Sequence, residues 1–445
     1  MTGNNARLTV FFQDKQIGHL EFIENNQCQF SYTDEWLMSA TAFAISPHIP
    51  LAAKVDSQTI IHFIRNLFPE GTLFDSLLEN LGTSKHNIYG ILKAIGHDTQ
   101  GALTFGNPIL KTEPLLRKIT ESELIQKLDT QSIQELVMWD GKYRLSVAGV
   151  QRKLNILVKD SAFFLAEGDY SSTHILKFSK PQQNHLIINE LICMRLADAI
   201  NMTVPEVCFK QFGQHSALLV TRFDRKLTDH QVLKRHVIDG CQILNKPPDY
   251  KYEQNYGSSP DVQHIREGIN ITELFKLSDL MYIPIQYKDS LMDWVLFNLI
   301  IGNSDAHGKN ISFFISHQGM RLSPFYDLVS IAYEAVQNPH IDTQLAMAIG
   351  DNFDLETLKA YDLLSFAENI DFPLSQIAKR LSKILNKIET ILNNNDDFYI
   401  KKEDDNINKA MQTHGNHIIA LIKKRVRYFR KEVIECPYVI EMLFK

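Results

Sequence analysis

The sequence predicts an α+β fold with three parts: a small N-terminal α+β domain over residues 1–105, a strand-rich lobe over 106–224 and a mostly helical lobe over 225–445. Three observations predict it. Apolar and polar residues alternate over 8–33, five strand-like runs surround one helical run between 145 and 224, and helical periodicity dominates the rest of the chain. We therefore expect a bilobal core with a cleft between its lobes, preceded by the small domain.

The elements follow in order along the chain. After the alternating strands, helical periodicity appears in SQTIIHFIRNLFPEG and SKHNIYGILKAIG, and the connector GNPILKTEPLLRK then leads to the next lobe. There we expect a hairpin from LSVAGVQRKLNILV and SAFFLAE, a short strand at HILKFS, an amphipathic helix at HLIINELICMRLADAI, and strands at EVCFKQF and SALLVTRFD. Helices follow RFDR, interrupted by two segments that we expect to be loops, 247–261 and 393–406.

The composition excludes several classes of protein. A chain of 445 residues with 44% apolar and 22% charged residues is typical of a soluble multidomain protein, and its net charge of −6 gives no reason to expect direct nucleic-acid or membrane binding. No apolar run is long enough to span a membrane, and signal-peptide features are missing, so we expect a cytoplasmic protein. Five dispersed cysteines predict reduced thiols and argue against zinc. The basic run over 423–431 predicts the solvated face of a helix.

The stretch IIGNSDAHGKNISFF, residues 300–314, gathers polar residues between apolar flanks. Asp305 precedes Asn310 by five residues, and Asp327 follows a predicted strand, ISFFIS, and a turn at HQGM. Phosphoryl transfer needs one carboxylate to orient the attacking hydroxyl, and an Asn and a second Asp to hold Mg²⁺; D-x-x-x-x-N followed by such an Asp is the order in protein kinases. The alternative is that Asp305 and Asn310 cap helices or shape a turn.

Two charged residues upstream fit the same chemistry. Lys177 lies in the middle of the predicted strand HILKFS, where its side chain can reach nucleotide phosphates. Glu190 lies thirteen residues later in a helix whose apolar side is expected to pack against the sheet, so Glu190 is placed to pair with Lys177. The alternatives are a lysine on an edge strand and a solvated glutamate.

The stretch SVAGVQRK, 146–153, lies where a phosphate-covering loop is expected. It has one glycine where the usual kinase loop has three. The backbone N–H groups of Ala148, Gly149 and Val150 can still cradle phosphates, because an anion nest depends on backbone geometry.

Two further positions border the expected cleft. In LLVTRFD, backbone groups of Thr221 to Phe223 are placed to bind an adenine edge, with the Phe223 ring against the base. His307 either shapes its loop or orients Asp305 and touches a phosphate; we favour structural support.

These motifs, in this order, resemble the HipA family, the kinase toxins of bacterial type II toxin–antitoxin systems, over nearly the whole chain. NLFPEG and DTQGALTF are similar to parts of that family's N-terminal domain. The similarity to its kinase core is carried by SVAGVQRK, NELICMRLADAI, TRFDR, CQIL, GNSDAHGKN, SPFYDLVS and LAMAIG.

The resemblance implies a serine/threonine protein kinase on a divergent bilobal kinase fold that uses ATP and Mg²⁺, phosphorylates an aminoacyl-tRNA synthetase and arrests growth. It also implies a small helix-turn-helix antitoxin as partner, so that DNA is reached only through that protein. Autophosphorylation of a loop serine, here Ser146, is implied to expel the phosphate loop. The same resemblance makes Asp305 the catalytic residue and Asn310 and Asp327 the Mg²⁺ ligands. It also places Lys177 and His307 at the phosphates and Phe223 beside the adenine.

Two positions depart from the family pattern. Ile238 stands where a glutamate is common, although His236 and Asp239 on either side are kept, and Arg152 stands where other members carry an acidic residue. Two other functions fit the same features: a small-molecule or lipid kinase on this fold, or a non-catalytic co-repressor that acts with a DNA-binding antitoxin. The net charge of −6 argues against this chain gripping DNA by itself.

Overall fold

The chain forms two compact units. The computed structural model describes residues 6–23, 27–106, 116–130, 132, 136–144, 152–166, 170–179, 183, 185–229, 231–395 and 397–443, without the side chain of Tyr143. Unit 1 comprises Met1–Gln182, Lys210–Pro248 and Ser312–Ser323, and unit 2 comprises Gln183–Phe209, Asp249–Ile311 and Pro324–Lys445. The three-part division expected from the sequence stays a prediction.

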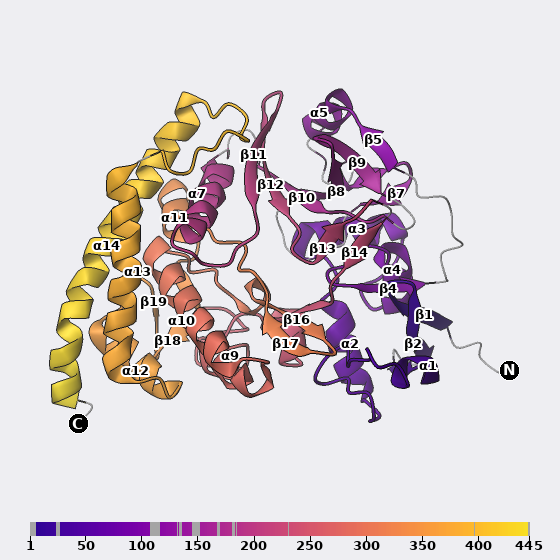
Figure 1. The fold of residues 1–445 in the computed structure, drawn as a ribbon, viewed down its shortest axis with the longest axis horizontal. Helices are drawn as coiled ribbons and strands as arrows, with labels where there is room; N and C mark the ends of the chain where they lie inside the picture. The colour runs from indigo at the N-terminus through magenta and orange to yellow at the C-terminus, as the bar shows by residue number, and fades with distance from the viewer. Residues whose placement is uncertain are drawn as a thin grey trace. The chain divides into compact units, whose positions relative to one another are not determined.

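Unit 1 begins with a four-stranded antiparallel sheet in the order β3-β2-β1-β4, accompanied by short helices (Figure 1). Its elements are β1 (Ala6–Phe12), β2 (Lys15–Ile23), β3 (Gln27–Tyr32), α1 (Asp34–Leu37), α2 (Ser57–Arg65), α3 (Gly71–Leu81), α4 (Ile88–Ile95) and β4 (Leu103–Gly106). The predicted strands and the helices α2 and α4 are confirmed. Helix α3 was not predicted, because it starts at Gly71, two residues after Pro69, and buries only Leu73 and Leu77.

A six-stranded sheet follows in the order β11-β12-β10-β8-β9-β5. Its strands are β5 (Leu116–Ile119), β8 (Lys153–Lys159), β9 (Ala162–Ala166), β10 (His174–Phe178), β11 (Val207–Phe212, whose first three residues are counted in unit 2) and β12 (His215–Thr221). The predicted strands are confirmed, except that 145–151 lie outside the described residues. Within β10, Leu176 and Phe178 are buried and alternate with Lys177, as strand geometry requires.

The remaining elements of unit 1 are small. They are α5 (Glu121–Asp129), β6 (Met138–Trp139), β7 (Lys142–Tyr143), β13 (Arg225–Leu227), β14 (Val232–Lys234), β15 (Val237–Asp239), α8 (Gly240–Ile243), β16 (Ser312–Ser316) and β17 (Gly319–Leu322). Strands β16 and β17 form the strand–turn–strand predicted between Asn310 and Asp327.

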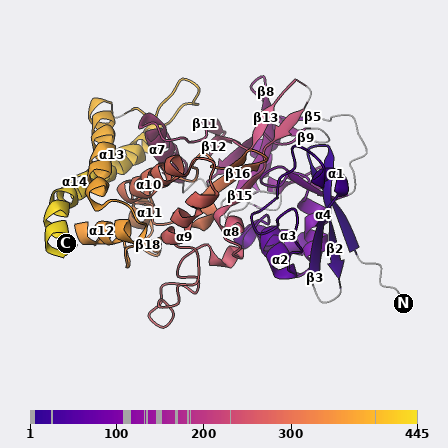
Figure 2. The ribbon, with the colours of Figure 1, turned by 60° about the horizontal axis from the view of Figure 1, so that its bottom comes forward.

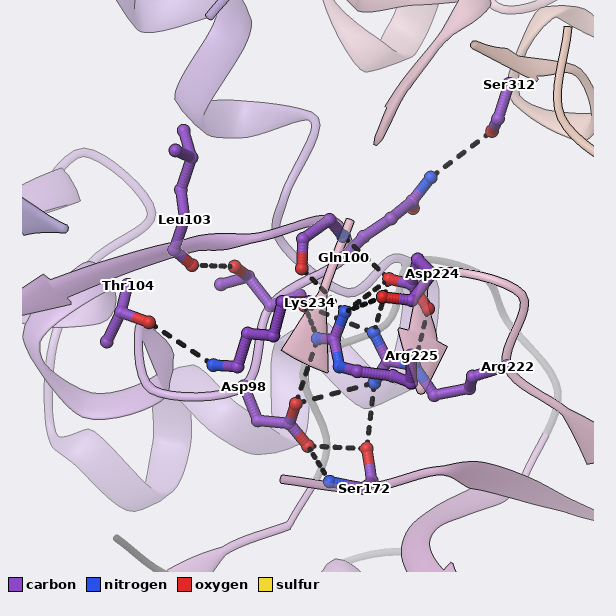
Figure 3. A network of polar contacts seen from close by, with 12 residues as sticks. Asp98, Gln100, Leu103, Thr104, Ser172, Arg222, Asp224, Arg225, Lys234 and Ser312 are labelled. Carbon is purple, nitrogen blue, oxygen red and sulfur yellow. Dashed lines mark hydrogen bonds and ion pairs between the residues drawn. The ribbon is translucent and has the colours of Figure 1, made fainter. Parts of the chain in front are cut away.

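A buried ion network links the N-terminal sheet region of unit 1 to the six-stranded sheet (Figure 3). Arg222 binds the Asp224 carboxylate through two nitrogens, at 3.0 and 2.8 Å, and Arg225 approaches the same carboxylate at 2.7 Å. Asp98, in the loop between α4 and β4, accepts hydrogen bonds from the Ser172 hydroxyl at 2.6 Å and from Arg225 at 3.1 Å. The loop after α4 is thereby fixed to the segments that enter β10 and leave β12.

Backbone groups complete this network. The Gly101 N–H donates to Asp224 at 2.9 Å, and the Gly101 and Thr99 carbonyls accept from Arg225 at 2.6 and 2.7 Å. Gly101 has a φ of +77°, and a Cβ there would press on the backbone of Val237. Glycine is therefore needed for the loop to approach this closely.

Unit 2 is mostly helical. Its elements are α7 (His185–Ala199), the 3₁₀ helix η3 (Pro248–Tyr250, whose first residue is counted in unit 1), α9 (Ile271–Lys276), η4 (Leu277–Leu280), α10 (Pro284–Ile301), η5 (Gly308–Asn310), α11 (Ile331–Gln337), β18 (Gln344–Ile349), β19 (Asn352–Asp354), α12 (Ala360–Asn369), α13 (Leu374–Asn394) and α14 (Lys409–Leu443). Helices α13 and α14 lie side by side (Figures 1 and 2). Among the described helices, none is long and apolar enough to cross a membrane.

The basic run over 423–431 is on α14, and its prediction as a solvated face is only partly correct. Arg425 is buried, because its Nε and Nη2 donate to the Leu299 carbonyl at 3.0 and 2.9 Å, in the last turn of α10. Its Nη1 donates to Glu356 at 2.6 Å. Arg425 therefore adds two donors to a carbonyl at the end of α10 that also accepts the Gly302 N–H at 3.3 Å.

Candidate active site

The candidate loop begins where α10 ends. The helix stops at Gly302, which adopts the left-handed conformation with a φ of +75°. A Cβ at this position would come within 2.7 Å of the Ala332 side chain. Glycine is therefore required here both for the backbone turn and for the contact with α11.

Two buried asparagines hold the first part of the loop. Asn303 donates through Nδ2 to the Oδ1 of Asn298 at 2.8 Å, and its backbone N–H donates to the Asn298 carbonyl at 2.8 Å. The Oδ1 of Asn303 accepts the backbone N–H of Asp305 at 3.2 Å. The position of Asp305 is thus set by side chains that are themselves anchored in α10.

Asp305, His307 and Asn310 form one hydrogen-bonded turn. The Asp305 carbonyl accepts from the His307 N–H and from the Asn310 side-chain Nδ2, each at 2.9 Å. The His307 ring accepts the Lys309 N–H through Nδ1 at 3.2 Å, at the start of η5. His307 shapes the loop in this way; contact with a phosphate stays a prediction.

The segment with Asp327 is joined to this loop. The Tyr326 hydroxyl donates to the Lys309 carbonyl at 2.7 Å, and the Phe325 ring stacks on Trp294 of α10 at 6.1 Å. Asp327 itself has a φ of +59°, a conformation that non-glycine residues adopt rarely and that is found preferentially at functional sites.

Asn189 in α7 holds the other end of the Asp327 segment. Buried completely, it donates to the Ser330 carbonyl at 2.9 Å and to Glu334 at 2.7 Å, and it accepts the Ser330 N–H at 2.9 Å. The sequence did not reveal this role, because Ser330 and Glu334 are 141 and 145 positions away from Asn189 in the chain.

The donor set suits Mg²⁺. The Nδ2 of Asn310 is bonded to Asp305, so its amide oxygen is the atom that remains for a cation, and Asp327 supplies a carboxylate. Magnesium prefers such oxygen ligands and takes only one or two from the protein when phosphates complete its shell. The described residues contain no group of three His, Cys, Asp or Glu that could hold a metal by itself.

The remaining predicted residues are in separate places. Lys177 is on β10, between β12 and β8, opposite Leu218 and Lys153, so the edge-strand interpretation is wrong. Glu190 is 2% exposed in α7, so it is not a solvated glutamate. Lys177 belongs to unit 1 and Glu190 to unit 2, and their pairing stays a prediction.

Thr221 ends β12, and the Phe223 ring meets Phe314 edge-on at 5.8 Å. Ser146, Ala148, Gly149 and Val150 lie outside the described residues.

The two departures from the family pattern are both buried. Ile238 lies on β15 opposite Phe313, while Asp239 caps α8 by accepting the Gln242 N–H at 2.8 Å. Arg152 is 8% exposed, and burial lowers the pKa of its guanidinium. Position 238 is thus an apolar core position in this protein.

Tyr252 contacts the candidate loop, and the sequence did not identify it. Its hydroxyl donates to the Oδ1 of Asp305 at 2.7 Å, and its ring meets the His307 ring edge-on at 5.1 Å. It is one of three tyrosines in the segment PPDYKYEQNYGSSPD, and no local pattern sets it apart from the other two.

Comparison with known proteins identifies related sequences over most of the chain. Residues 8–106 match the HipA N-terminal domain and residues 145–392 match the HipA-like C-terminal domain. The serine/threonine-protein kinase toxin HipA of Shewanella oneidensis is 42% identical over 392 residues, which cover 87% of this chain and 88% of that protein.

A solved structure, that of the Shewanella oneidensis HipA, HipB and operator DNA complex, matches with a TM-score of 0.87 at 38% identity. The match covers 96% of this chain and 99% of the matched chain, and it confirms the kinase-like α+β fold class predicted from the sequence.

Proposed function

Because this chain belongs to the HipA family of serine/threonine-protein kinase toxins, we propose that Asp305, Asn310 and Asp327 form its phosphotransfer centre. The observation that supports this most directly is the shared turn in which Asn310 donates to the Asp305 carbonyl at 2.9 Å. The link from Tyr326 to Lys309 adds the segment that carries Asp327. Three groups with the order and chemistry of a kinase site are thereby held by one hydrogen-bonded framework.

Each residue has a separate task in the proposed reaction. Asp305 accepts the hydrogen bond of a serine or threonine hydroxyl and aims its oxygen at the γ-phosphorus of ATP. Asn310 and Asp327 would hold Mg²⁺, which supplies positive charge against the phosphates. Lys177 and Glu190 would orient the phosphates.

Substitution of the two carboxylates tests this assignment. Asp305→Asn and Asp327→Ala should each reduce ³²P transfer from ATP to proteins of a dialysed bacterial extract to background. The exposed Asp261→Asn is the control and should behave like the wild type. Circular dichroism should show all variants folded; undiminished transfer by a folded Asp305→Asn would refute the assignment.

Nucleotide binding is proposed for strands β10 and β12 and the phosphate loop. Lys177 would meet the phosphates, together with backbone groups of Ala148, Gly149 and Val150, while Thr221 to Phe223 would border the adenine. Lys177→Met should raise the dissociation constant for ATP–Mg²⁺ in calorimetry. A dissociation constant equal to that of the wild type would contradict it.

We further propose that Ser146 is autophosphorylated. A phosphoserine adds about −1.5 to −2 charges in a loop that receives other phosphates, so repulsion should expel the loop and stop nucleotide binding. Ser146→Ala should keep its ATP affinity after prolonged incubation with ATP, while the wild type loses it. Equal loss in both proteins would exclude this mechanism.

The proposed target is an aminoacyl-tRNA synthetase in the cytoplasm, and the proposed partner is a DNA-binding antitoxin. Phosphoproteomics after brief expression of wild type and Asp305→Asn should reveal the target serine. The kinase should retard operator DNA in a gel only when the antitoxin is present, because a net charge of −6 disfavours binding by this chain alone. Retardation without the antitoxin would contradict the proposal.

A further inference from the structure

We propose that Tyr252 is a positioning residue for Asp305, which holds one oxygen of its carboxylate so that the other faces the acceptor hydroxyl. This inference rests on the proposed function, because it takes Asp305 as the group that receives the acceptor hydroxyl. It assigns a role in phosphoryl transfer to a loop, 249–268, that carries no kinase motif.

The contact itself is short and directed. The Tyr252 hydroxyl donates to Asp305 Oδ1 at 2.7 Å, a length typical of a hydrogen bond to a carboxylate. The Tyr252 ring rests edge-on against His307, and the neighbouring Lys251 carbonyl accepts the Gly308 N–H at 2.9 Å. The pair of residues 251–252 thus contacts the catalytic turn at three points.

The segment that carries Tyr252 is anchored on its far side by a buried carboxylate. The Glu253 N–H donates to the Ala346 carbonyl at 2.9 Å, and its carboxylate accepts from the Ala348 N–H at 2.8 Å and from Arg266 at 2.7 Å. The Ala346 N–H in turn donates to the Ser304 carbonyl at 2.7 Å. Strand β18 is therefore bonded both to the Tyr252 segment and to the loop that carries Asp305.

A close backbone approach also restrains Tyr252. Gly268 donates to the Glu253 carbonyl at 3.2 Å, and Ile269 donates to the Tyr250 carbonyl at 2.9 Å. A Cβ at Gly268 would overlap the Tyr252 carbonyl. The main chain at 252 is thus packed against Gly268, and the next residue, Glu253, is bonded to β18. The Tyr252 side chain therefore starts from a restrained backbone when its hydroxyl reaches Asp305.

This arrangement leaves one carboxylate oxygen for the reaction. Among the described residues, no donor contacts the Oδ2 of Asp305, while its Oδ1 is occupied by Tyr252. A carboxylate with one oxygen bound cannot rotate freely, and a preoriented acceptor lowers the barrier without strengthening nucleotide binding. Removal of the hydroxyl should therefore lower kcat and leave the KM for ATP unchanged.

The test compares Tyr252→Phe with Tyr256→Phe in the full chain. Tyr256 is in the same loop and is 58% exposed, so its substitution is a matched loss of one hydroxyl. With the dialysed bacterial extract as acceptor, Tyr252→Phe should lower kcat about tenfold, as for the loss of one hydrogen bond to a charged group, with the KM for ATP within about twofold of the wild type. Tyr256→Phe should have the wild-type kcat.

A second measurement separates positioning from a general structural effect. In calorimetry, the dissociation constant of Tyr252→Phe for ATP–Mg²⁺ should be within about twofold of that of Tyr256→Phe, because a residue that positions Asp305 acts on the transfer step and not on nucleotide binding. A tenfold weaker affinity of Tyr252→Phe for ATP–Mg²⁺, a wild-type kcat for Tyr252→Phe, or phosphate on Tyr252 in mass spectra would each overturn the inference. Transfer that is absent from the wild type would instead refute the proposed function.

Discussion

Asp224→Asn should destabilise the protein strongly, because it removes one of two negative charges from a buried network with two arginines. In this network Asp224 accepts hydrogen bonds from Arg222, Arg225 and the Gly101 N–H (Figure 3). The side chains of Arg222 and Arg225 are 2% and 0% exposed, so water cannot replace the lost carboxylate. Asp98, whose side chain is 26% exposed, would remain as their charged partner.

The size of the decrease in the free energy of unfolding follows from the burial of the two arginines. Removing one partner of a buried ion pair typically costs about 3–5 kcal/mol, because the other charge is left uncompensated. The asparagine side chain can still accept one hydrogen bond, so we expect the lower half of that range, about 3–4 kcal/mol. At about 2–4 °C per kcal/mol for a domain of this size, the midpoint of thermal unfolding should fall by roughly 6–16 °C.

Urea unfolding followed by circular dichroism and a thermal scan measure this effect. Asp229→Asn is the matched control, since Asp229 is exposed in the same unit and its substitution changes the charge equally. The control should differ from the wild type by less than about 0.5 kcal/mol. If the free energies of unfolding of Asp224→Asn and of the control differed by less than about 1 kcal/mol, they would refute the claim that this buried network stabilises the protein.

The difference in free energy of unfolding between the wild type and Asp224→Asn should also depend on pH, with a sign that follows from the pKa of Asp224. Burial opposes ionisation of Asp224, but Arg222 and Arg225 outweigh it and hold the pKa of that carboxyl well below its usual range. Its contribution to the free energy of unfolding is therefore full above the unfolded pKa of about 3.9 and is lost as the pH falls towards the folded value. The difference between wild type and Asp224→Asn should be constant above about pH 5 and shrink below pH 4.

Three other substitutions have defined outcomes. Burial lowers the pKa of His236 to about 4, so between about pH 6.5 and 4 only the unfolded chain binds this proton. The free energy of unfolding should therefore decrease by up to about 1.4 kcal/mol for each unit by which the pH is lowered in this range. Urea unfolding at pH 7, 6 and 5 should show a smaller decrease in His236→Phe, and equal decreases in both proteins would disprove this. Gly302→Ala should lower the free energy of unfolding by about 1–3 kcal/mol and reduce ³²P transfer. Gly82 has a similar φ of +56°, but a Cβ there would meet no atom within 4 Å, so Gly82→Ala should lower the free energy of unfolding less. Equal decreases in the two variants would show that the contact with Ala332 at position 302 is unimportant. Asn189→Leu should release Ser330 and thereby loosen the segment that carries Asp327. The Mg²⁺ concentration needed for half-maximal ³²P transfer should then rise severalfold, and an unchanged concentration would argue against a link between Asn189 and the metal.

Local pattern explains why so much of the fold could be predicted. The alternation around Lys177 located β10 correctly, because strand geometry puts successive side chains on opposite sides. The polar stretch 302–310 was proposed as a site because a kinase loop needs particular residue types at a fixed spacing, and its role stays a prediction. Both signals are contained in fewer than ten neighbouring residues.

Contacts between distant residues could not be predicted in the same way. Tyr252 and Asp305 are 53 residues apart, and Asp98 and Arg225 are 127 apart, so no periodicity relates them. The prediction for Arg425 was wrong for the same reason. As a member of a basic run it was expected to be solvent-exposed, but it is buried and donates to the Leu299 carbonyl, 126 positions away. Polar side chains that connect remote segments are therefore the part of the site that required a structure.

The bond from Arg425 to Leu299 also has a consequence for when the enzyme becomes competent. The two residues are separated by 126 positions, so at about 5–20 residues per second the ribosome adds the arginine roughly 6–25 s after the end of α10. Until then, the helix that precedes the candidate loop lacks the side chain that binds its Leu299 carbonyl. The nascent chain of this kinase toxin thus lacks one anchor of its candidate loop, and we expect chains truncated before α14 to transfer no phosphate.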